Sequence, residues 1–208
     1  MTGNRRLVVA TRNRKKLAEL RRLLDGAPVV LASLDDYSNA GDVKETGKTF
    51  QENAILKATE TSAVIGEWVV ADDSGLVVDA LGGRPGVYSA RYAGPDQNDE
   101  RNTAKVLDEL RHVEAEQRTA RFTCAIALAA PGQVLFVTVE SCEGRIAAEP
   151  RGNTGFGYDP IFIPDGYDRT FAELGSEIKD RLSHRGKALR SFRKELENLL
   201  RQDNDHGR

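Results

Sequence analysis

Cysteine is scarce in this sequence: Cys124 and Cys142 are the only two among 208 residues. Neither cysteine has a second thiol at metal-binding spacing or a histidine nearby, which argues against a zinc site and against a disulfide framework. Two lone cysteines are more typical of buried thiols in a reducing compartment. We therefore expect a cytoplasmic protein.

Long hydrophobic runs are also missing. No apolar stretch approaches the roughly 20 residues that cross a bilayer, and residues 1–6 lead into a strand pattern without the apolar core of a signal peptide. Charge of one sign is not in excess, since 30 Lys and Arg face 32 Asp and Glu, for a net charge of −2. That balance gives no overall attraction to nucleic acid polymers or to anionic membranes, so we expect neither as a partner.

The pattern of apolar residues predicts the fold class. Short strand-like runs alternate with amphipathic helical stretches, and a chain of 208 residues can bury one large core. Residues 121–130 and 133–141 read as two strands joined by Pro131-Gly132, which predicts an antiparallel hairpin. Such a pair disfavours an all-parallel sheet. We expect an α/β fold of the mixed α+β type.

No internal repeat or linker divides the sequence. We therefore expect residues 1–208 to form a single domain. The last helix should end near Leu200, because the residues after it are polar. Residues 202–208 are then predicted to be a disordered tail.

The most informative stretch is Val69-Val70-Ala71-Asp72-Asp73-Ser74-Gly75-Leu76-Val77-Val78. Its apolar ends read as strand segments, and the polar insert predicts a bend at the end of a strand. Two carboxylates at a strand end need water, a donor or a cation. Mg²⁺ is a cation that takes one or two carboxylates together with substrate phosphates. The alternative is a plain surface turn, in which these residue types are common.

Basic residues surround the start of the first predicted helix. Leu7–Thr11 reads as a buried strand, and Asn13 follows as a helix N-cap. Such a turn presents backbone N–H groups at the positive end of a helix. The cations there suit a bound anion better than they suit helix stability, although a solvated basic turn is the alternative.

A second helix is predicted to begin at the capping box Thr49-Phe50-Gln51-Glu52 and to run to about Ile65. Asn53 and Lys57 lie one turn apart on it and could reach one ligand together. Their alternative is an ordinary exposed polar face. The preceding loop holds Glu45 as a spare oxygen ligand.

Two later segments suit a planar, anionic ligand. Glycines bracket Phe156 in residues 149–160, so that a ring can approach a base closely. The alternative is a turn whose aromatic side chains cover the core. Ser183 is placed to cap the last helix, which would put His184 and Arg185 in its first turn as hydrogen-bond donors.

Taken in chain order, these segments resemble the inosine triphosphate pyrophosphatase family from Leu7 to about Phe192. The motifs that carry the resemblance are Thr11-Arg12-Asn13-Arg14-Lys15-Lys16, Thr49-Phe50-Gln51-Glu52-Asn53-Ala54, Ala71-Asp72-Asp73-Ser74-Gly75-Leu76, Leu81-Gly82-Gly83-Arg84-Pro85-Gly86, Phe156-Gly157-Tyr158-Asp159-Pro160 and Ser183-His184-Arg185.

The resemblance implies an elongated mixed sheet flanked by helices, with two lobes and the active-site cleft between them. It also implies an activity: hydrolysis of the non-standard purine nucleotides ITP, dITP and XTP to the monophosphate and pyrophosphate. Mg²⁺ is the implied cofactor, a homodimer is the implied assembly, and removal of such nucleotides from the cellular pool is the implied role.

The resemblance also assigns roles by motif. Asp73 would be the catalytic carboxylate and a metal ligand, with Glu45 and Asp72 as further metal ligands. Arg12 departs from the glycine that many members have. The implied substrate contacts are Thr11, Arg12, Asn13, Arg14, Lys15, Lys16 and Lys57 for the triphosphate, Phe156, Gly157, Tyr158 and Asp159 for base and sugar, Ser74 and Lys179 for the nucleotide, and His184 and Arg185 for the base edge.

Two other functions fit the same residues. A related pyrophosphatase could act on pyrimidine or methylated nucleotides, although residues 156–159 and 183–185 favour a purine. A nucleotide-binding module without catalysis would keep the lysines and Phe156 but would not need Asp73.

Overall fold

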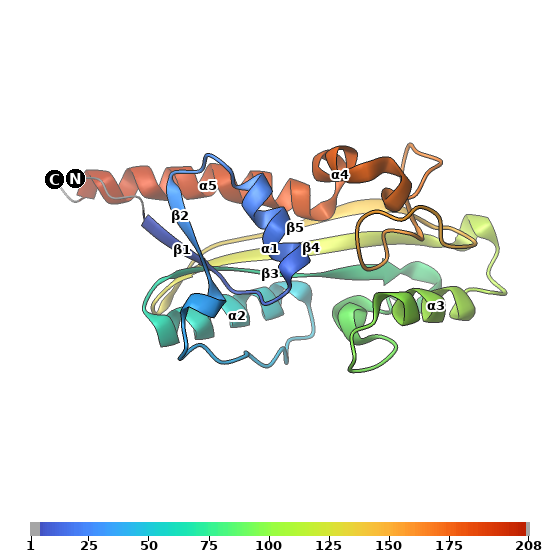
Figure 1. The fold of residues 1–208 in the computed structure, drawn as a ribbon, viewed down its shortest axis with the longest axis horizontal. Helices are drawn as coiled ribbons and strands as arrows, with labels where there is room; N and C mark the ends of the chain where they lie inside the picture. The colour runs from blue at the N-terminus through green and yellow to red at the C-terminus, as the bar shows by residue number, and fades with distance from the viewer. Residues whose placement is uncertain (1–4, 207–208) are drawn as a thin grey trace. The chain divides into compact units, whose positions relative to one another are not determined.

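The computed structural model describes residues 5–206. In this part of the chain six strands form one mixed sheet in the order β2-β1-β3-β4-β5-β6. Strand β1 (Arg5–Val9) pairs in parallel with β2 (Val29–Ser33) and β3 (Trp68–Val78), whereas β5 (Gln133–Ile146) pairs antiparallel with β6 (Phe162–Pro164). Helices flank the sheet (Figure 1). The predicted fold class is confirmed.

The chain packs into two compact units. Within the described residues, the first unit comprises residues 5–73, 125–139 and 188–206, and the second comprises residues 74–124 and 140–187. Strands β3, β4 (Thr119–Ala130) and β5 contribute residues to both units. Whether the chain behaves as a single domain stays a prediction.

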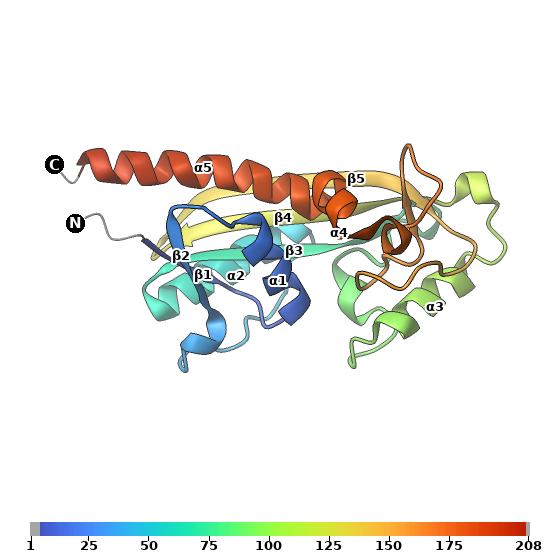
Figure 2. The ribbon, with the colours of Figure 1, turned by 45° about the horizontal axis from the view of Figure 1, so that its top comes forward.

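The first unit is built around strands that are buried on both faces. Val69, Val70 and Ala71 of β3 are at most 1% exposed, as expected where helices cover both sides of a strand. Helix α2 (Phe50–Ile65) and helix α5 (His184–His206) lie on opposite sides of these strands (Figures 1 and 2). The unit also holds α1 (Arg14–Leu23) and the short helix η1 (Leu34–Asp36).

The predicted helix starts are confirmed by their caps. The Asn13 side chain accepts hydrogen bonds from the backbone N–H groups of Lys15 and Lys16 at the start of α1. The Thr49 side chain accepts one from Glu52 N at 3.1 Å. The carboxylate of Glu52, however, accepts from Lys48 N at 2.6 Å. The capping box at α2 is therefore formed in only one direction.

Strand β3 corrects one prediction. The polar insert does not bend the chain, because β3 runs without interruption from Trp68 to Val78. Asp72 and Asp73 therefore lie inside a strand and are only 3% and 6% exposed. They remain in regular structure because neighbouring cations and an amide offset the loss of water, as described below. Position 75 requires glycine, because a Cβ atom there would overlap Ser89.

The second unit surrounds an aromatic core. Phe122 packs against Phe162 and Phe171 with ring centroids 4.6 and 6.3 Å away. Helices α3 (Asp99–Glu109) and α4 (Phe171–Leu182) lie on opposite sides of the strands (Figures 1 and 2). The short helices of this unit are η2 (Asp79–Leu81), η3 (Gly86–Arg91) and η4 (Ala115–Gln117).

Two elements of this unit are absent from the sequence-based prediction. Strand β6 has only three residues, too few to show a period. Helix α4 is interrupted at Gly175, whose φ of 80° and ψ of 173° are not helical. The break disturbs the periodic pattern on which a helix prediction rests.

Helix α5 is longer than predicted. It continues to His206, past the end near Leu200, so residues 202–206 are helical and not an irregular tail. The reason lies in the sequence, because no glycine or proline occurs between Gly186 and Gly207 to stop the helix. Residues 207 and 208 lie outside the described part of the chain.

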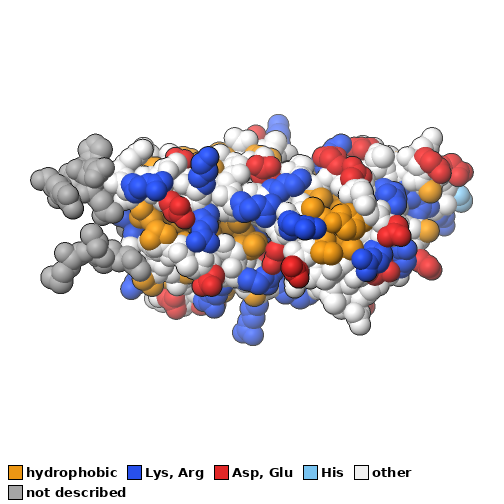
Figure 3. Space-filling view, turned by 90° about the horizontal axis from the view of Figure 1, so that it is seen from above, with side chains coloured by type: hydrophobic (Ala, Val, Ile, Leu, Met, Phe, Trp, Pro, Cys, Tyr) orange, Lys and Arg blue, Asp and Glu red, His pale blue; other side chains and the backbone are white. Residues whose placement is uncertain are grey.

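The surface and the cysteines agree with the composition. Lys and Arg side chains are interspersed with Asp and Glu on the face seen from above (Figure 3). Cys124 and Cys142 are both buried free thiols. Between residues 5 and 206, no helix has the length and hydropathy of a membrane span.

Tyr92 ties the loop after β3 to helix α3. Its hydroxyl donates to Glu109 Oε2 at 2.7 Å and accepts from Arg84 Nη1 at 3.2 Å. The same Arg84 nitrogen lies 2.9 Å from Glu109 Oε2. Burial, together with the bond to Glu109, raises the pKa of Tyr92 from 10.0 to about 12.

The raised pKa of Tyr92 predicts a loss of stability in alkali. The protonated hydroxyl is the hydrogen-bond donor, so its stabilisation is fully present below pH 10.0 and is lost as the pH rises towards about 12. We expect Tyr92→Phe to lower Tm at neutral pH, and we expect its difference from wild type to shrink across this interval. Thermal denaturation of both proteins at a series of pH values measures this. A Tm difference that stays constant up to pH 12 would contradict the assignment.

Candidate active site

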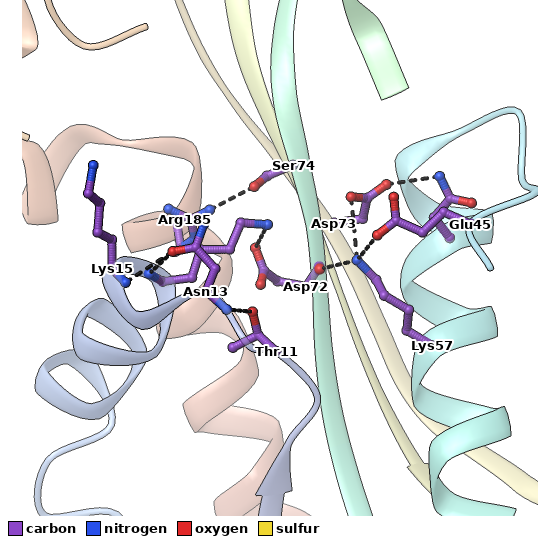
Figure 4. Close-up of polar contacts among 11 residues, drawn as sticks. Thr11, Asn13, Lys15, Glu45, Lys57, Asp72, Asp73, Ser74 and Arg185 are labelled. Carbon is purple, nitrogen blue, oxygen red and sulfur yellow. Dashed lines mark hydrogen bonds and ion pairs between the residues drawn. The ribbon is translucent and has the colours of Figure 1, made fainter. Parts of the chain in front are cut away.

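One ammonium group organises the polar centre of the first unit. Lys57, on α2, places its Nζ 3.0 Å from Glu45 Oε1, 2.7 Å from the backbone oxygen of Asp72 and 3.5 Å from Asp73 Oδ1 (Figure 4). The Lys57 and Asp73 side chains are only 13% and 9% exposed. Little water screens this interaction.

Asn53 holds Asp73 from the other side. Its Nδ2 donates to Asp73 Oδ2 at 3.0 Å, and its Oδ1 accepts from Gly47 N at 2.8 Å. The residue is fully buried. It therefore connects the catalytic candidate to the loop that carries Glu45. The one-turn spacing of Asn53 and Lys57 in the sequence is the signal for this pair, but the resemblance did not assign Asn53 a role in the site.

Burial disfavours the charged forms of both Asp73 and Lys57, but their neighbours change the outcome differently. Desolvation is the largest influence on Asp73, and it raises the pKa of that carboxyl although Lys57, Lys16 and Asn53 oppose it. Desolvation is also the largest single influence on Lys57 and would lower its pKa, but Asp73, Asp72 and Glu45 together raise it. Lys57 is thus held as a cation, and Asp73 binds a proton more readily than an ordinary aspartate does.

Asp72 faces away from Asp73. Successive residues of a strand point to opposite faces, and Figure 4 shows the two carboxylates on opposite sides of β3. The Asp72 carboxylate lies 3.1 Å from Lys16 Nζ. The geometry therefore groups Asp73 with Glu45 and Lys57, and Asp72 with Lys16.

The turn before α1 is already internally bonded. Asn13 N donates to Thr11 Oγ1 at 3.2 Å, and the Asn13 cap uses the N–H groups of Lys15 and Lys16. These two N–H groups are therefore not open to an anion, although the sequence predicts that they would be. Arg14 and Lys15 are exposed, and the Lys15 side chain extends away from the carboxylates in Figure 4. Lys16, by contrast, places its Nζ against the Asp72 carboxylate.

Arg12 binds the loop after β2. Its guanidinium donates to Asp42 Oδ1 at 2.9 Å, to Asp35 Oδ1 at 3.0 Å and to the backbone oxygen of Ala40 at 3.0 Å. These three acceptors lie in the segment that leads to Glu45. The structure thus gives Arg12 a contact that its predicted role in triphosphate binding did not include.

A second polar group belongs to the second unit. Arg185, in the first turn of α5, donates from Nη2 to Ser74 Oγ at 2.7 Å (Figure 4). The Phe156 ring has two cations near it, with Lys179 Nζ 4.4 Å and Arg185 Cζ 5.7 Å from its centroid. Lys179 and Arg185 are 6% and 3% exposed. Both cations lie within the range of favourable interaction with the face of an aromatic ring.

Asp159 and Tyr158 shape the turn that carries Phe156. Asp159 Oδ2 accepts from Lys179 Nζ at 2.7 Å and from Phe156 N at 2.8 Å. Gly155 must be glycine there, because a Cβ atom would overlap that carboxylate. The Tyr158 hydroxyl donates to the backbone oxygen of Ser89 at 2.8 Å, inside the core. Both residues support the turn, and their predicted contacts with base and sugar stay predictions.

Ser183 caps α5 as predicted. Its Oγ accepts from Gly186 N at 3.1 Å. His184 and Arg185 therefore lie in the first turn of the helix. The His184 ring stacks on Phe122 at a centroid distance of 4.8 Å and an interplanar angle of 11°, and the residue is 4% exposed. This packing fixes the plane of the imidazole.

The acidic residues around Lys57 can be compared with the ligands that Mg²⁺ needs. Within the described chain, no group of three or more His, Cys, Asp and Glu side chains could hold a metal by itself. Glu45 and Asp73 nevertheless converge on one cationic group, Lys57 Nζ. Mg²⁺ commonly takes one or two carboxylates and completes its shell with phosphates and water. Glu45 and Asp73 could supply two such ligands, and the metal itself stays a prediction.

Fold and site together define a mixed α/β protein with a buried carboxylate–lysine centre and a cation-flanked aromatic ring. The chain belongs to the Ham1 family, whose model matches residues 7–195. A dITP/XTP pyrophosphatase from Geobacillus kaustophilus is 53% identical over 194 residues, which cover 93% of this chain and 95% of that protein. The resemblance stated from the sequence is confirmed.

Solved structures of two similar proteins support the same fold. A HAM1 protein from Coxiella burnetii has a TM-score of 0.85 at 41% identity, with 93% of this chain and 98% of that one covered. A nucleoside-triphosphatase / dITP/XTP pyrophosphatase from Mycobacterium abscessus has a TM-score of 0.76 at 48% identity, with 90% and 98% covered.

The contacts of Arg12 predict a local change on mutation. Arg12→Ala removes all three bonds to the segment 35–42, so we expect faster amide hydrogen exchange there. The global Tm should fall little, because the Arg12, Asp35 and Asp42 side chains are 48%, 69% and 81% exposed and such ion pairs contribute less than about 1 kcal/mol. Arg14→Ala, an exposed neighbour in the same turn, is the control. Unchanged exchange in Arg12→Ala would refute the role in holding the loop.

Proposed function

We propose that this chain hydrolyses the non-standard purine nucleotides ITP, dITP and XTP to the monophosphate and pyrophosphate. The observation that carries the proposal is the buried Asp73 carboxylate, held between the Lys57 ammonium and the Asn53 amide. A relative that is 53% identical is named a dITP/XTP pyrophosphatase, which supports the substrate class. Removal of such nucleotides from the cellular pool is the corresponding biological role.

Asp73 is proposed as the catalytic carboxylate. Attack of water on the α-phosphorus requires a group that orients the water or accepts its proton. A carboxylate whose pKa is raised by burial is better suited to accept a proton than an ordinary aspartate. Asn53 and Lys57 fix the position of that carboxylate before any substrate binds, which is the preorganisation that catalysis requires.

Asp73 and Glu45 would hold Mg²⁺, with Asp72 as a further candidate. When bound, the ion would neutralise negative charge that develops on the phosphate oxygens. Lys57 and Lys16 are proposed to supply positive charge to the triphosphate from the protein side. Each now lies against a carboxylate, so the arrival of phosphates would offer them a second anionic partner.

The second unit is proposed to read the base. Phe156 offers a ring for stacking, while Arg185 and His184 offer donors. Hypoxanthine and xanthine carry an acceptor oxygen at position 6, where adenine has a donor amino group. Buried donors would pair with that oxygen and would be left unpaired opposite adenine, which is costly. Arg185 is 3% exposed, so an unpaired donor at this position would be largely cut off from water.

We also infer that the protein acts as a homodimer in the cytoplasm. The family resemblance supports the dimer. The buried free thiols of Cys124 and Cys142 support a reducing compartment.

Pyrophosphate release from ITP, XTP, dATP and dGTP in the presence of Mg²⁺ tests the activity. We expect turnover of ITP and XTP and little turnover of dATP, whose base has a donor amino group at position 6. Guanine shares the oxygen at position 6, so low turnover of dGTP would require a further contact at position 2. We expect chelation of the metal to abolish the activity. No release from ITP or XTP would reject the proposed function. Equal release from all four would reject the base selectivity alone.

Substitution of Asp73 tests the catalytic role. We expect Asp73→Asn to lower kcat by about 10²-fold or more, because it removes the charged acceptor while preserving the shape of the side chain. Binding of ITP, measured by calorimetry, should remain detectable. Asp79→Asn is the matched control, since Asp79 pairs with Thr119 and Arg121 at the surface. Near-normal turnover by Asp73→Asn would leave a binding module or a different catalytic residue as the explanation.

A further inference from the structure

Two side chains of helix α3 hold the turn that carries Phe156. They bind the backbone N–H and C=O groups of one residue, Gly157. Asp99 Oδ2 accepts a hydrogen bond from Gly157 N at 2.9 Å. The Thr103 hydroxyl donates to the backbone oxygen of Gly157 at 3.4 Å. Asp99 and Thr103 are four residues apart on α3, so their side chains lie on one face of the helix. Gly157 is thus fixed at both its N–H and its C=O group.

The start of α3 is itself firmly anchored. Asn102, which is 2% exposed, accepts from Ala93 N at 2.7 Å and donates to the backbone oxygen of Ala90 at 2.9 Å. Asn98 caps the helix by accepting from Arg101 N at 2.8 Å. Asp99 is the first helical residue, where the positive end of the helix stabilises a carboxylate. The pair that holds Gly157 therefore stands on a rigid base.

The backbone is consequently restrained both at Phe156 itself and at the residue that follows it. The N–H group of Phe156 donates to Asp159, and the next residue is held by α3. The φ angle of +61° at Gly157 is a left-handed conformation that a glycine adopts without strain. The ring is thereby held beside Lys179 without help from a ligand.

We propose that Asp99 and Thr103 are positioning residues that preset the Phe156 ring for stacking on the substrate base. The inference rests on the proposed function, since it concerns the same nucleotide. Stacking on an aromatic ring does not discriminate strongly between bases. Loss of the pair should therefore weaken binding of ITP and XTP in the same proportion. The chemical step at Asp73 should proceed at its normal rate once the substrate is bound.

The first experiment compares Asp99→Ala with Asp99→Asn. The alanine variant loses the acceptor for Gly157 N, so we expect faster hydrogen exchange at residues 155–159. Its KM for ITP and for XTP should rise about fivefold, with kcat within about twofold of wild type. The asparagine variant keeps an acceptor oxygen and should restore most of both properties. Asp96→Ala is the control, because Asp96 pairs with Arg101 at the surface.

The second experiment uses Thr103, which is 5% exposed. Thr103→Val preserves the shape and removes the donor, whereas Thr103→Ser keeps the donor. We expect a smaller rise in KM for the valine variant, because its bond is long, and wild-type KM for the serine variant. A fall in kcat with unchanged KM, or exchange at 155–159 that equals wild type in Asp99→Ala, would overturn the inference.

Failure of the proposed hydrolysis can be distinguished from failure of the positioning role of Asp99 and Thr103. If the wild-type protein released no pyrophosphate from ITP or XTP, the proposed function would be wrong. The exchange measurement would still decide whether Asp99 and Thr103 fix the turn, because it requires no substrate. Binding of ITP by calorimetry would decide whether that turn contributes to nucleotide affinity.

Discussion

The ion pair between Lys57 and Asp73 is the constraint on which the first unit's polar centre depends. A carboxylate in the middle of a buried strand loses most of its hydration, and that loss is costly unless a charge and hydrogen bonds replace the water. Lys57 supplies the charge, and Asn53 supplies a hydrogen bond. With both in place, β3 continues through Asp72 and Asp73 as regular strand.

The same strand links the carboxylate centre to the polar group of the second unit. Asp73 is followed directly by Ser74, which accepts from Arg185. Arg185 and Lys179 flank the Phe156 ring, and the turn around that ring is fixed by Asp159 on one side and by α3 on the other. Asp73 and the turn that carries Phe156 are thus each held by polar partners, which is the arrangement that a preorganised site would require.

Local signals in the sequence were enough for much of this arrangement. Helix caps act over two or three residues, so Asn13, Thr49 and Ser183 were identified correctly. The interruption of β3 was predicted wrongly, because its continuity depends on Lys57 and Asn53, which lie 15 to 20 residues away in the chain. Asp99 was missed for a similar reason: its partner, Gly157, is 58 residues away. The kink at Gly175 hid α4 from any periodic pattern.

A double-mutant cycle of Lys57→Met and Asp73→Asn, followed by thermal or urea denaturation, tests the central interaction most directly. The two side chains are nearly buried, so we predict a coupling free energy of at least about 1 kcal/mol in the free protein. A coupling within about 0.3 kcal/mol of zero would mean that the two groups contribute independently. That result would contradict the account of Lys57 as the group that holds Asp73 inside the strand.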